Sequence, residues 1–169
     1  MTTIKNFGFM WERDQVNWGQ QGRGGSSSLD GAQNGKLKRR VNFLEQMGIY
    51  VLYDKFEQPV QIGQAKRIFK RLKDHRRDHL RNRWSLFSWF GFYKVGARNK
   101  LLVKDQAAEL RRTLTLGEAL NELEAILIQV LEPRLNRRGP NWIDAEEYLQ
   151  ISGSGAFNGD DGEDASEAT

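Results

Sequence analysis

Residues 48–63, GIYVLYDKFEQPVQIG, predict a β-hairpin around which the rest of this 169-residue chain is expected to be arranged. Residues 48–53 are apolar, β-branched or aromatic, which is the composition of a buried strand. The polar residues 54–58 precede Pro59 and suit a hairpin loop. Residues 60–63 are the second short strand of this expected hairpin, and their final glycine lets the chain leave the sheet.

A basic helix is expected directly after the hairpin. From Gln64 onward the apolar residues recur at helical spacing. Arg67, Arg71 and His75 are four residues apart, so they stack along one flank of that helix. Residues 66–83 hold nine Lys or Arg against two Asp, and a strongly cationic surface is therefore predicted here.

Two further elements complete the expected core. Residues 84–93, WSLFSWFGFY, contain six aromatic residues and predict a third strand beside the hairpin. Residues 115–131 predict a helix that begins with a capping box between Thr115 and Glu118. Glu124 falls at the edge of its apolar face, where a carboxylate is costly unless a cation or a hydrogen bond satisfies it. The residues of that face are Leu120, Leu123, Ile126, Leu127, Val130 and Leu131.

Short motifs along residues 47–137 resemble, in their order and spacing, the signature of the GIY-YIG nucleases. The second motif departs from the family pattern, because it begins with glutamine where the family usually has tyrosine. The motifs are GIY at 48–50, QIG at 61–63, Arg71 followed one turn later by His75, Glu124 in a later helix, and Asn136 shortly after Pro133.

This resemblance implies both a fold and an activity. The implied fold is an α+β domain with a small three-stranded antiparallel sheet flanked by helices. The implied activity is that of an endonuclease, which hydrolyses phosphodiester bonds of DNA with one divalent cation, Mg²⁺ or Mn²⁺, and with low sequence specificity. Such an enzyme suits defence, restriction or repair in a bacterium or a phage.

The resemblance also implies the roles of individual residues. Glu124 would hold the metal ion, and Arg71 would contact the scissile phosphate. Tyr50 would orient the attacking water, and either Tyr50 or His75 would accept its proton. Asn136 would position the glutamate or the phosphate. Tyr50, Arg71 and Glu124 must then surround one ion. The expected nucleic-acid contacts are Gln61, Gln64, Lys66, Arg67, Lys70 and Arg76.

The charge of the chain is distributed unevenly. The formal net charge is +4, but all 26 Lys and Arg residues precede Asp144. Eight of the 22 Asp and Glu residues lie from Asp144 to the end. A basic body with an acidic end favours a polyanionic partner, and DNA is the partner we expect.

Composition divides the chain into four parts. Residues 1–18 are an aromatic N-terminal arm, which either packs back on the domain or docks a second copy or another protein. Residues 19–40 have the composition of a flexible linker that ends in a basic cluster. The nuclease-like domain covers residues 41–151 and closes with a short helix at 142–151. Residues 152–169 are an acidic tail expected to be disordered, either solubilising or lying over the basic groove.

Composition also limits the compartment and the chemistry. The chain contains no cysteine, which excludes disulfides and thiolate metal sites. It has no apolar run long enough for a membrane helix, and residues 1–20 lack the apolar centre of a signal peptide. We therefore expect a soluble, cytoplasmic protein. Two other functions remain open at this point: a catalytically inactive nucleic-acid-binding module on the same scaffold, and a protein-interaction adaptor that uses the aromatic arm.

Overall fold

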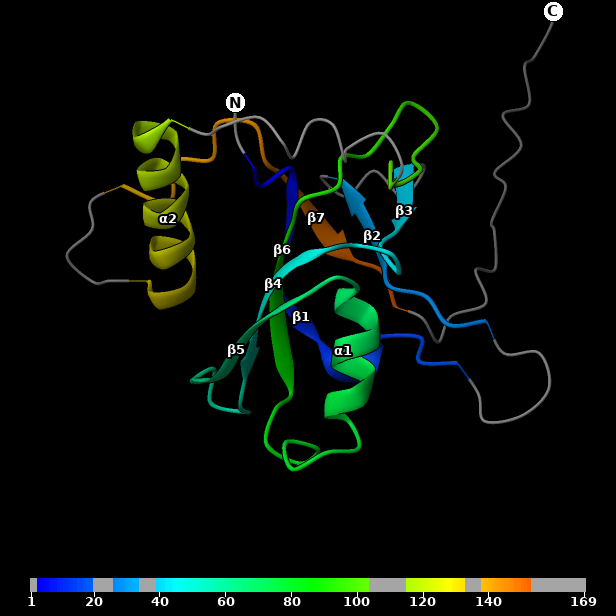
Figure 1. Cartoon of the computed structure of the whole chain (residues 1–169). Helices are drawn as coiled ribbons and strands as arrows, with labels where there is room; N and C mark the ends of the chain where they lie inside the picture. The colour runs from blue at the N-terminus through cyan, green and yellow to red at the C-terminus, as the bar shows by residue number, and fades with distance from the viewer. Residues whose placement is uncertain (1–2, 20–25, 34–38, 104–114, 133–137, 153–169) are drawn as a thin grey trace, which may run out of the picture.

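Among the residues that the structure describes, the fold is a seven-stranded mixed sheet with two α-helices (Figure 1). The computed structural model describes residues 3–19, 26–33, 39–103, 115–132 and 138–152. The strands are β1 (Asn6–Glu12), β2 (Asp30–Gln33), β3 (Arg40–Asn42), β4 (Gly48–Tyr53), β5 (Pro59–Ala65), β6 (Leu86–Gly91) and β7 (Glu146–Gln150). The helices are the 3₁₀ turn η1 (Arg13–Gln15), α1 (Ile68–His75) and α2 (Leu116–Leu131).

The strand order is β3-β2-β7-β1-β6-β4-β5, so the expected three-stranded antiparallel sheet is wrong. The hairpin β4–β5 and the neighbouring β6 do form as the sequence predicts, but they are only one part of a larger sheet. Strand β1 pairs with β6 antiparallel and with β7 parallel. The short helix expected at 142–151 is also wrong, because β7 occupies residues 146–150 and pairs with both β1 and β2.

The stretch interpreted as an N-terminal arm contains β1, which lies near the middle of the sheet. Phe7 and Trp11 are both buried, but they belong to hydrophobic clusters on opposite faces. The register shifts between Gly8 and Trp11, and Met10 has a positive φ of 51°. This irregularity turns Trp11 to the other face, where its indole N–H donates to the carbonyl of Tyr148 in β7 at 3.0 Å. The arm is therefore part of the core.

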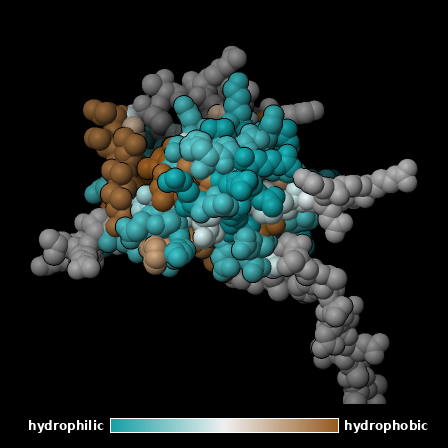
Figure 2. Space-filling view, turned by 90° about the horizontal axis from the view of Figure 1, so that it is seen from below, coloured by the Kyte–Doolittle hydropathy of each residue, from teal (hydrophilic) through white to brown (hydrophobic). Residues whose placement is uncertain are grey.

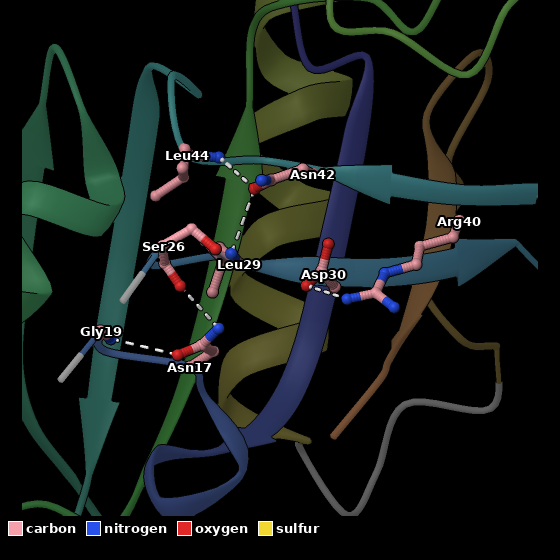
Figure 3. Close-up of polar contacts among 8 residues, drawn as sticks. All are labelled: Asn17, Gly19, Ser26, Leu29, Asp30, Arg40, Asn42 and Leu44. Carbon is pink, nitrogen blue, oxygen red and sulfur yellow. Dashed lines mark hydrogen bonds and ion pairs between the residues drawn. The ribbon is translucent and has the colours of Figure 1, made fainter. Parts of the chain in front are cut away.

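Part of the stretch interpreted as a linker is also in the sheet, as β2 and β3 (Figure 3). The buried carboxylate of Asp30 pairs with the guanidinium of Arg40 at 2.6 Å. The side-chain oxygen of Asn42 accepts the backbone N–H groups of Leu29 and Leu44, both at 3.1 Å. Asn17 bonds the carbonyl of Ser26 through its side-chain amide, which fastens the chain before β2. The predicted acidic tail, residues 152–169, lies outside the described residues except for Ser152.

Helices α1 and α2 cover opposite faces of the sheet. Tyr50 and Leu52 of β4 belong to the same hydrophobic cluster as the inward residues of α1, which are Ile68, Phe69 and Leu72. Val51 and Tyr53 of β4 point the other way, into a second cluster. Ile126 and Val130 of α2 pack against that second cluster. Side chains of successive strand residues alternate between faces, so each helix packs against a different face of β4.

Helix α2 has the predicted limits and the predicted capping box at Thr115 and Glu118. Its orientation differs from the expectation. Ala125 is buried, and the carboxylate of Glu122 accepts the backbone N–H groups of Thr3 and Ile4. The leucines that were expected in the core, among them Leu120, Leu123 and Leu127, are each more than half exposed. The helix is therefore turned so that its leucine-rich face points to solvent.

Candidate functional site

A buried hydrogen-bonded chain joins β4, α1 and the turn that follows α1. The Tyr50 hydroxyl lies 2.8 Å from His75 Nε2, and both residues are 1% exposed. His75 Nδ1 lies 2.7 Å from Asp78 Oδ2, whose side chain is 30% exposed. The structure therefore brings together two of the predicted site residues, Tyr50 and His75, and adds Asp78 as a third.

The protons of this chain can be assigned from the chemistry of Asp78. Burial raises the pKa of Asp78, but hydrogen bonds from the Leu80 backbone N–H and from His75 outweigh it and hold the pKa below its ordinary value. The carboxylate is therefore ionised at neutral pH and can only accept a hydrogen bond. The Nδ1–H of His75 donates to this carboxylate, and in that tautomer Nε2 accepts the hydroxyl proton of Tyr50.

Gly63 of β5 makes room for the Tyr50 phenol. The two residues are directly paired across the β4–β5 hairpin. A Cβ at position 63 would lie 2.3 Å from the Tyr50 hydroxyl oxygen, which is far inside van der Waals contact. Gln61 pairs with Leu52 and so shares the face of Tyr50, whereas Gln64 pairs with Ile49 and belongs to the opposite face. Of the two predicted glutamine contacts, only Gln61 lies on the side of the buried chain.

The cationic surface predicted for this region lies on the outside of α1. Arg71 is exposed one helical turn before His75, and Lys66 and Lys70 are exposed as well. Arg67 is half exposed and pairs with Glu45. Arg76 differs from the others, because its guanidinium carbon lies 4.6 Å from the centre of the Trp18 ring. Burial, and then the nearby cations of Arg13 and Arg77, lower the pKa of Arg76 from its ordinary value.

Glu124 is not close to the chain of Tyr50, His75 and Asp78. It is exposed on α2, which covers the opposite face of the sheet from α1. Its exposure also removes the argument that a cation must satisfy a carboxylate on a packed face. Asn136, the other downstream site residue, lies outside the described residues.

The side chains therefore do not fit a single ion shared by Tyr50, Arg71 and Glu124. Mg²⁺ and Mn²⁺ take several oxygen ligands in a compact shell. Within the described parts of the chain, no group of three or more His, Cys, Asp or Glu side chains could hold a metal ion. A site with one carboxylate needs no such group, but it does need that carboxylate beside the phosphate. For this reason we derive no chemical step through a metal.

Asp78 was not predicted as a site residue, because in the sequence it is one of two acidic residues in a basic segment. A signal was present, because Asp78 follows His75 by three residues, a spacing at which side chains near a helix end meet. Asp78 also caps the turn after α1 by accepting the Leu80 backbone N–H at 2.8 Å. Its position is thus fixed from two sides.

Comparisons with family models, with curated proteins and with solved structures find no match to this chain. The site must therefore be interpreted from its own geometry and from the resemblance of its motifs. No described helix is both long enough and apolar enough to span a membrane.

Proposed function

We propose that this protein is an endonuclease that binds DNA along the cationic face of α1 and hydrolyses its phosphodiester backbone. One observation carries the proposal: the chain from the Tyr50 hydroxyl through His75 to Asp78, with separations of 2.8 Å and 2.7 Å, and the exposed Arg71 one helical turn before His75. A phenol, an imidazole and a carboxylate in this order form a path for one proton.

The path works in the direction that hydrolysis needs. Tyr50 donates to His75 Nε2, so the phenol oxygen keeps its lone pairs for the proton of an attacking water. As that proton arrives, the phenol proton moves to His75, and ionised Asp78 stabilises the imidazolium that forms. Transfer to a positioned base of this kind is worth about 10² to 10⁴ in rate.

Arg71 is the group that can hold the phosphate. A guanidinium binds phosphate through two parallel N–H groups and neutralises the charge that develops in the transition state. Arg71 is exposed and so is open to DNA, whereas Tyr50 is only 1% exposed. Contact between water and phenol therefore requires β5 or α1 to move when the substrate binds. Gly63 is the residue of β5 that packs directly against the Tyr50 hydroxyl, so a movement of β5 there would uncover the phenol.

A second candidate is a DNA-binding protein without nuclease activity. The separation of Glu124 from Tyr50 across the sheet favours it, because the resemblance assigns the metal ion to that glutamate. In this alternative the hydrogen bonds of His75 only satisfy a buried polar group. The exposed cations of α1 would still bind the sugar–phosphate backbone.

Cleavage of supercoiled plasmid, assayed with Mg²⁺, with Mn²⁺ and with EDTA, separates the two candidates. We expect nicking by the intact protein and a loss of about 10²-fold or more in Arg71→Ala, the size seen when one transition-state donor is removed. Arg98→Ala, which removes an exposed arginine from the loop after β6, is the matched control and should cleave normally. DNA binding without cleavage under every condition would support the second candidate.

Glu124→Ala tests the metal assignment in the same assay. The family resemblance predicts that this variant loses nicking, because its metal ligand is gone. The geometry described here predicts that it retains nicking, because the carboxylate lies on the other side of the sheet. Retention together with loss in Arg71→Ala would place the chemistry wholly on the α1 face.

A further inference from the structure

Helix α2 presents an apolar stripe to solvent along its whole length. Figure 2 shows this hydrophobic surface at the left of the molecule, where α2 lies in Figure 1. At 100° per residue, the five side chains of the stripe fall within one narrow sector of the helix. The leucine stripe consists of Leu116, Leu120, Leu123, Leu127 and Leu131, which are 78%, 57%, 56%, 56% and 60% exposed.

The opposite side of α2 already has its partners. Ala125 is 1% exposed, and Ile126 packs on the sheet. Glu122 accepts two backbone N–H groups at the start of the chain, and Gln129 accepts the indole N–H of Trp142 at 3.3 Å. These contacts fix the rotation of the helix, so the leucine stripe is not available to the core of the same domain.

The size of the stripe matches what a pair of molecules needs. Five leucines, each more than half exposed, offer on the order of 100 Å² of apolar area apiece, or roughly 500 Å² per copy. Two copies would bury roughly 1,000 Å², the lower bound for a specific interface. Isolated monomers rarely expose a contiguous apolar patch larger than a few hundred Å².

The spacing of the leucines is that of a helix–helix seam. The first four residues of the stripe, from Leu116 to Leu127, are separated by four, three and four positions, the alternation found at the a and d positions of a coiled coil. Such a seam is self-complementary, so the same face of a second molecule fits it about a two-fold axis. Residues 116–131 carry three Glu and no Lys or Arg, which disfavours DNA or an anionic lipid surface as the occupant.

We propose that the leucine stripe is a homodimer interface, in which α2 of one molecule packs against α2 of a second copy. This replaces the aromatic arm as the contact between copies, since Phe7 and Trp11 are buried within one molecule. The proposal does not depend on nuclease activity. It leaves the cationic faces of both copies exposed on the far sides of their sheets.

The test is the molar mass of the full chain, measured by sedimentation velocity from about 1 to 100 μM. We expect a dimer for the intact protein and a monomer for Leu120→Gln/Leu127→Gln, with the dissociation constant raised at least 100-fold because four leucine contacts are lost per dimer. Both leucines are more than half exposed, so circular dichroism should show an unchanged fold.

Leu149→Gln provides the matched control, because Leu149 is 50% exposed on β7, outside the leucine stripe. This variant should remain a dimer. An unfolding midpoint that rises with protein concentration in the intact chain, but not in the double variant, would support the interface independently. A monomeric intact protein at 100 μM would overturn the proposal, and so would a double variant that dimerises as tightly as the intact chain.

Discussion

The Tyr50 hydroxyl can reach His75 only because position 63 carries no side chain. Gly63→Ala would place a methyl group 2.3 Å from the hydroxyl oxygen and 2.5 Å from the ring carbon that bears it. The Tyr50 ring must then move. This movement costs about 1–3 kcal/mol of stability and breaks the hydrogen bond between the Tyr50 hydroxyl and His75. Urea unfolding should show this loss, together with a loss of any nicking activity.

Gly117→Ala is the control for that substitution. A Cβ at position 117 meets nothing within 4 Å, and the residue is exposed in the first turn of α2. This change should stabilise the protein by up to about 1 kcal/mol, because alanine favours a helix. If Gly63→Ala were as stable and as active as the intact protein, the packing described around Tyr50 would be wrong.

Asp78 should make stability depend on pH in a defined direction. Its folded pKa lies below the ordinary value of 3.8, so the ionised form is favoured by folding. This contribution is fully present above about pH 4 to 5 and is lost as the pH falls through the folded pKa. Asp78→Asn weakens a charge-assisted hydrogen bond to His75, so we expect a deficit of about 1 kcal/mol at neutral pH.

The deficit of Asp78→Asn should shrink as the pH falls below about 4, since the intact carboxyl is then protonated too. Urea unfolding at pH 7 and at pH 3 measures both values. Asp74→Asn removes an exposed carboxylate from α1, just before this turn, and should show a smaller deficit at pH 7. A deficit for Asp78→Asn that grows on acidification would contradict the assigned hydrogen bond.

At the scale of elements, β1 is the strand on which the sheet depends. It pairs with β6 on one side and with β7 on the other. A chain restricted to residues 41–151, the domain predicted from composition, would lack β1 and β2 and expose the partner edges of β6 and β7. We expect this fragment to aggregate or to lack cooperative unfolding, which circular dichroism during heating would reveal. A sharp, reversible transition of the fragment would contradict the central place of β1.

The elements that the sequence predicts correctly are those with an uninterrupted pattern. The hairpin β4–β5 has a continuous apolar run and a clear turn, and α2 begins with a capping box. Strand β1 was not predicted from the sequence. The irregularity near Met10 interrupts the alternation of its side chains between the two faces, so Phe7 and Trp11 are buried on different faces. Strand β7 was not predicted, because three of the five residues of its sequence, EEYLQ, are polar and it buries little apart from Tyr148.

The orientation of α2 could not be predicted from its own residues. Its apolar positions cover most of the helix circumference, so two different faces could have met the sheet. Tertiary contacts fix the orientation, because Glu122 accepts backbone N–H groups of the segment before β1 and Gln129 accepts the indole N–H of Trp142. The orientation of α2 also sets the position of Glu124. The sequence therefore could not predict where Glu124 lies relative to Tyr50 and His75, which β4 and α1 bring together.

At the scale of the whole molecule, the sheet separates two surfaces with different properties. The α1 side carries exposed cations above the buried chain of Tyr50, His75 and Asp78. The α2 side carries the leucine stripe and three glutamates. A DNA duplex would meet the first surface and a second copy the second, so the two proposed partners do not compete for space.

DNA binding by the cationic face of α1 can be tested separately from cleavage. Each cation that neutralises a phosphate contributes about −0.9 to the slope of log K against log salt for duplex DNA. Lys70→Ala/Arg71→Ala should therefore make the slope less steep by nearly two units. Lys94→Ala/Lys100→Ala removes two exposed cations from the segment that follows β6 and should leave the slope unchanged. Equal slopes for both double variants would exclude α1 as the DNA-binding face.

The most direct test of the account compares plasmid nicking by Tyr50→Phe and Tyr53→Phe. Both substitutions remove one hydroxyl from a buried tyrosine of β4, but Tyr50 faces His75 whereas Tyr53 lies in the cluster on the opposite face. We expect Tyr50→Phe to lose about 10² to 10⁴ in cleavage rate, whereas Tyr53→Phe should cleave as the intact protein does. Equal cleavage by the two variants, with both correctly folded, would contradict it.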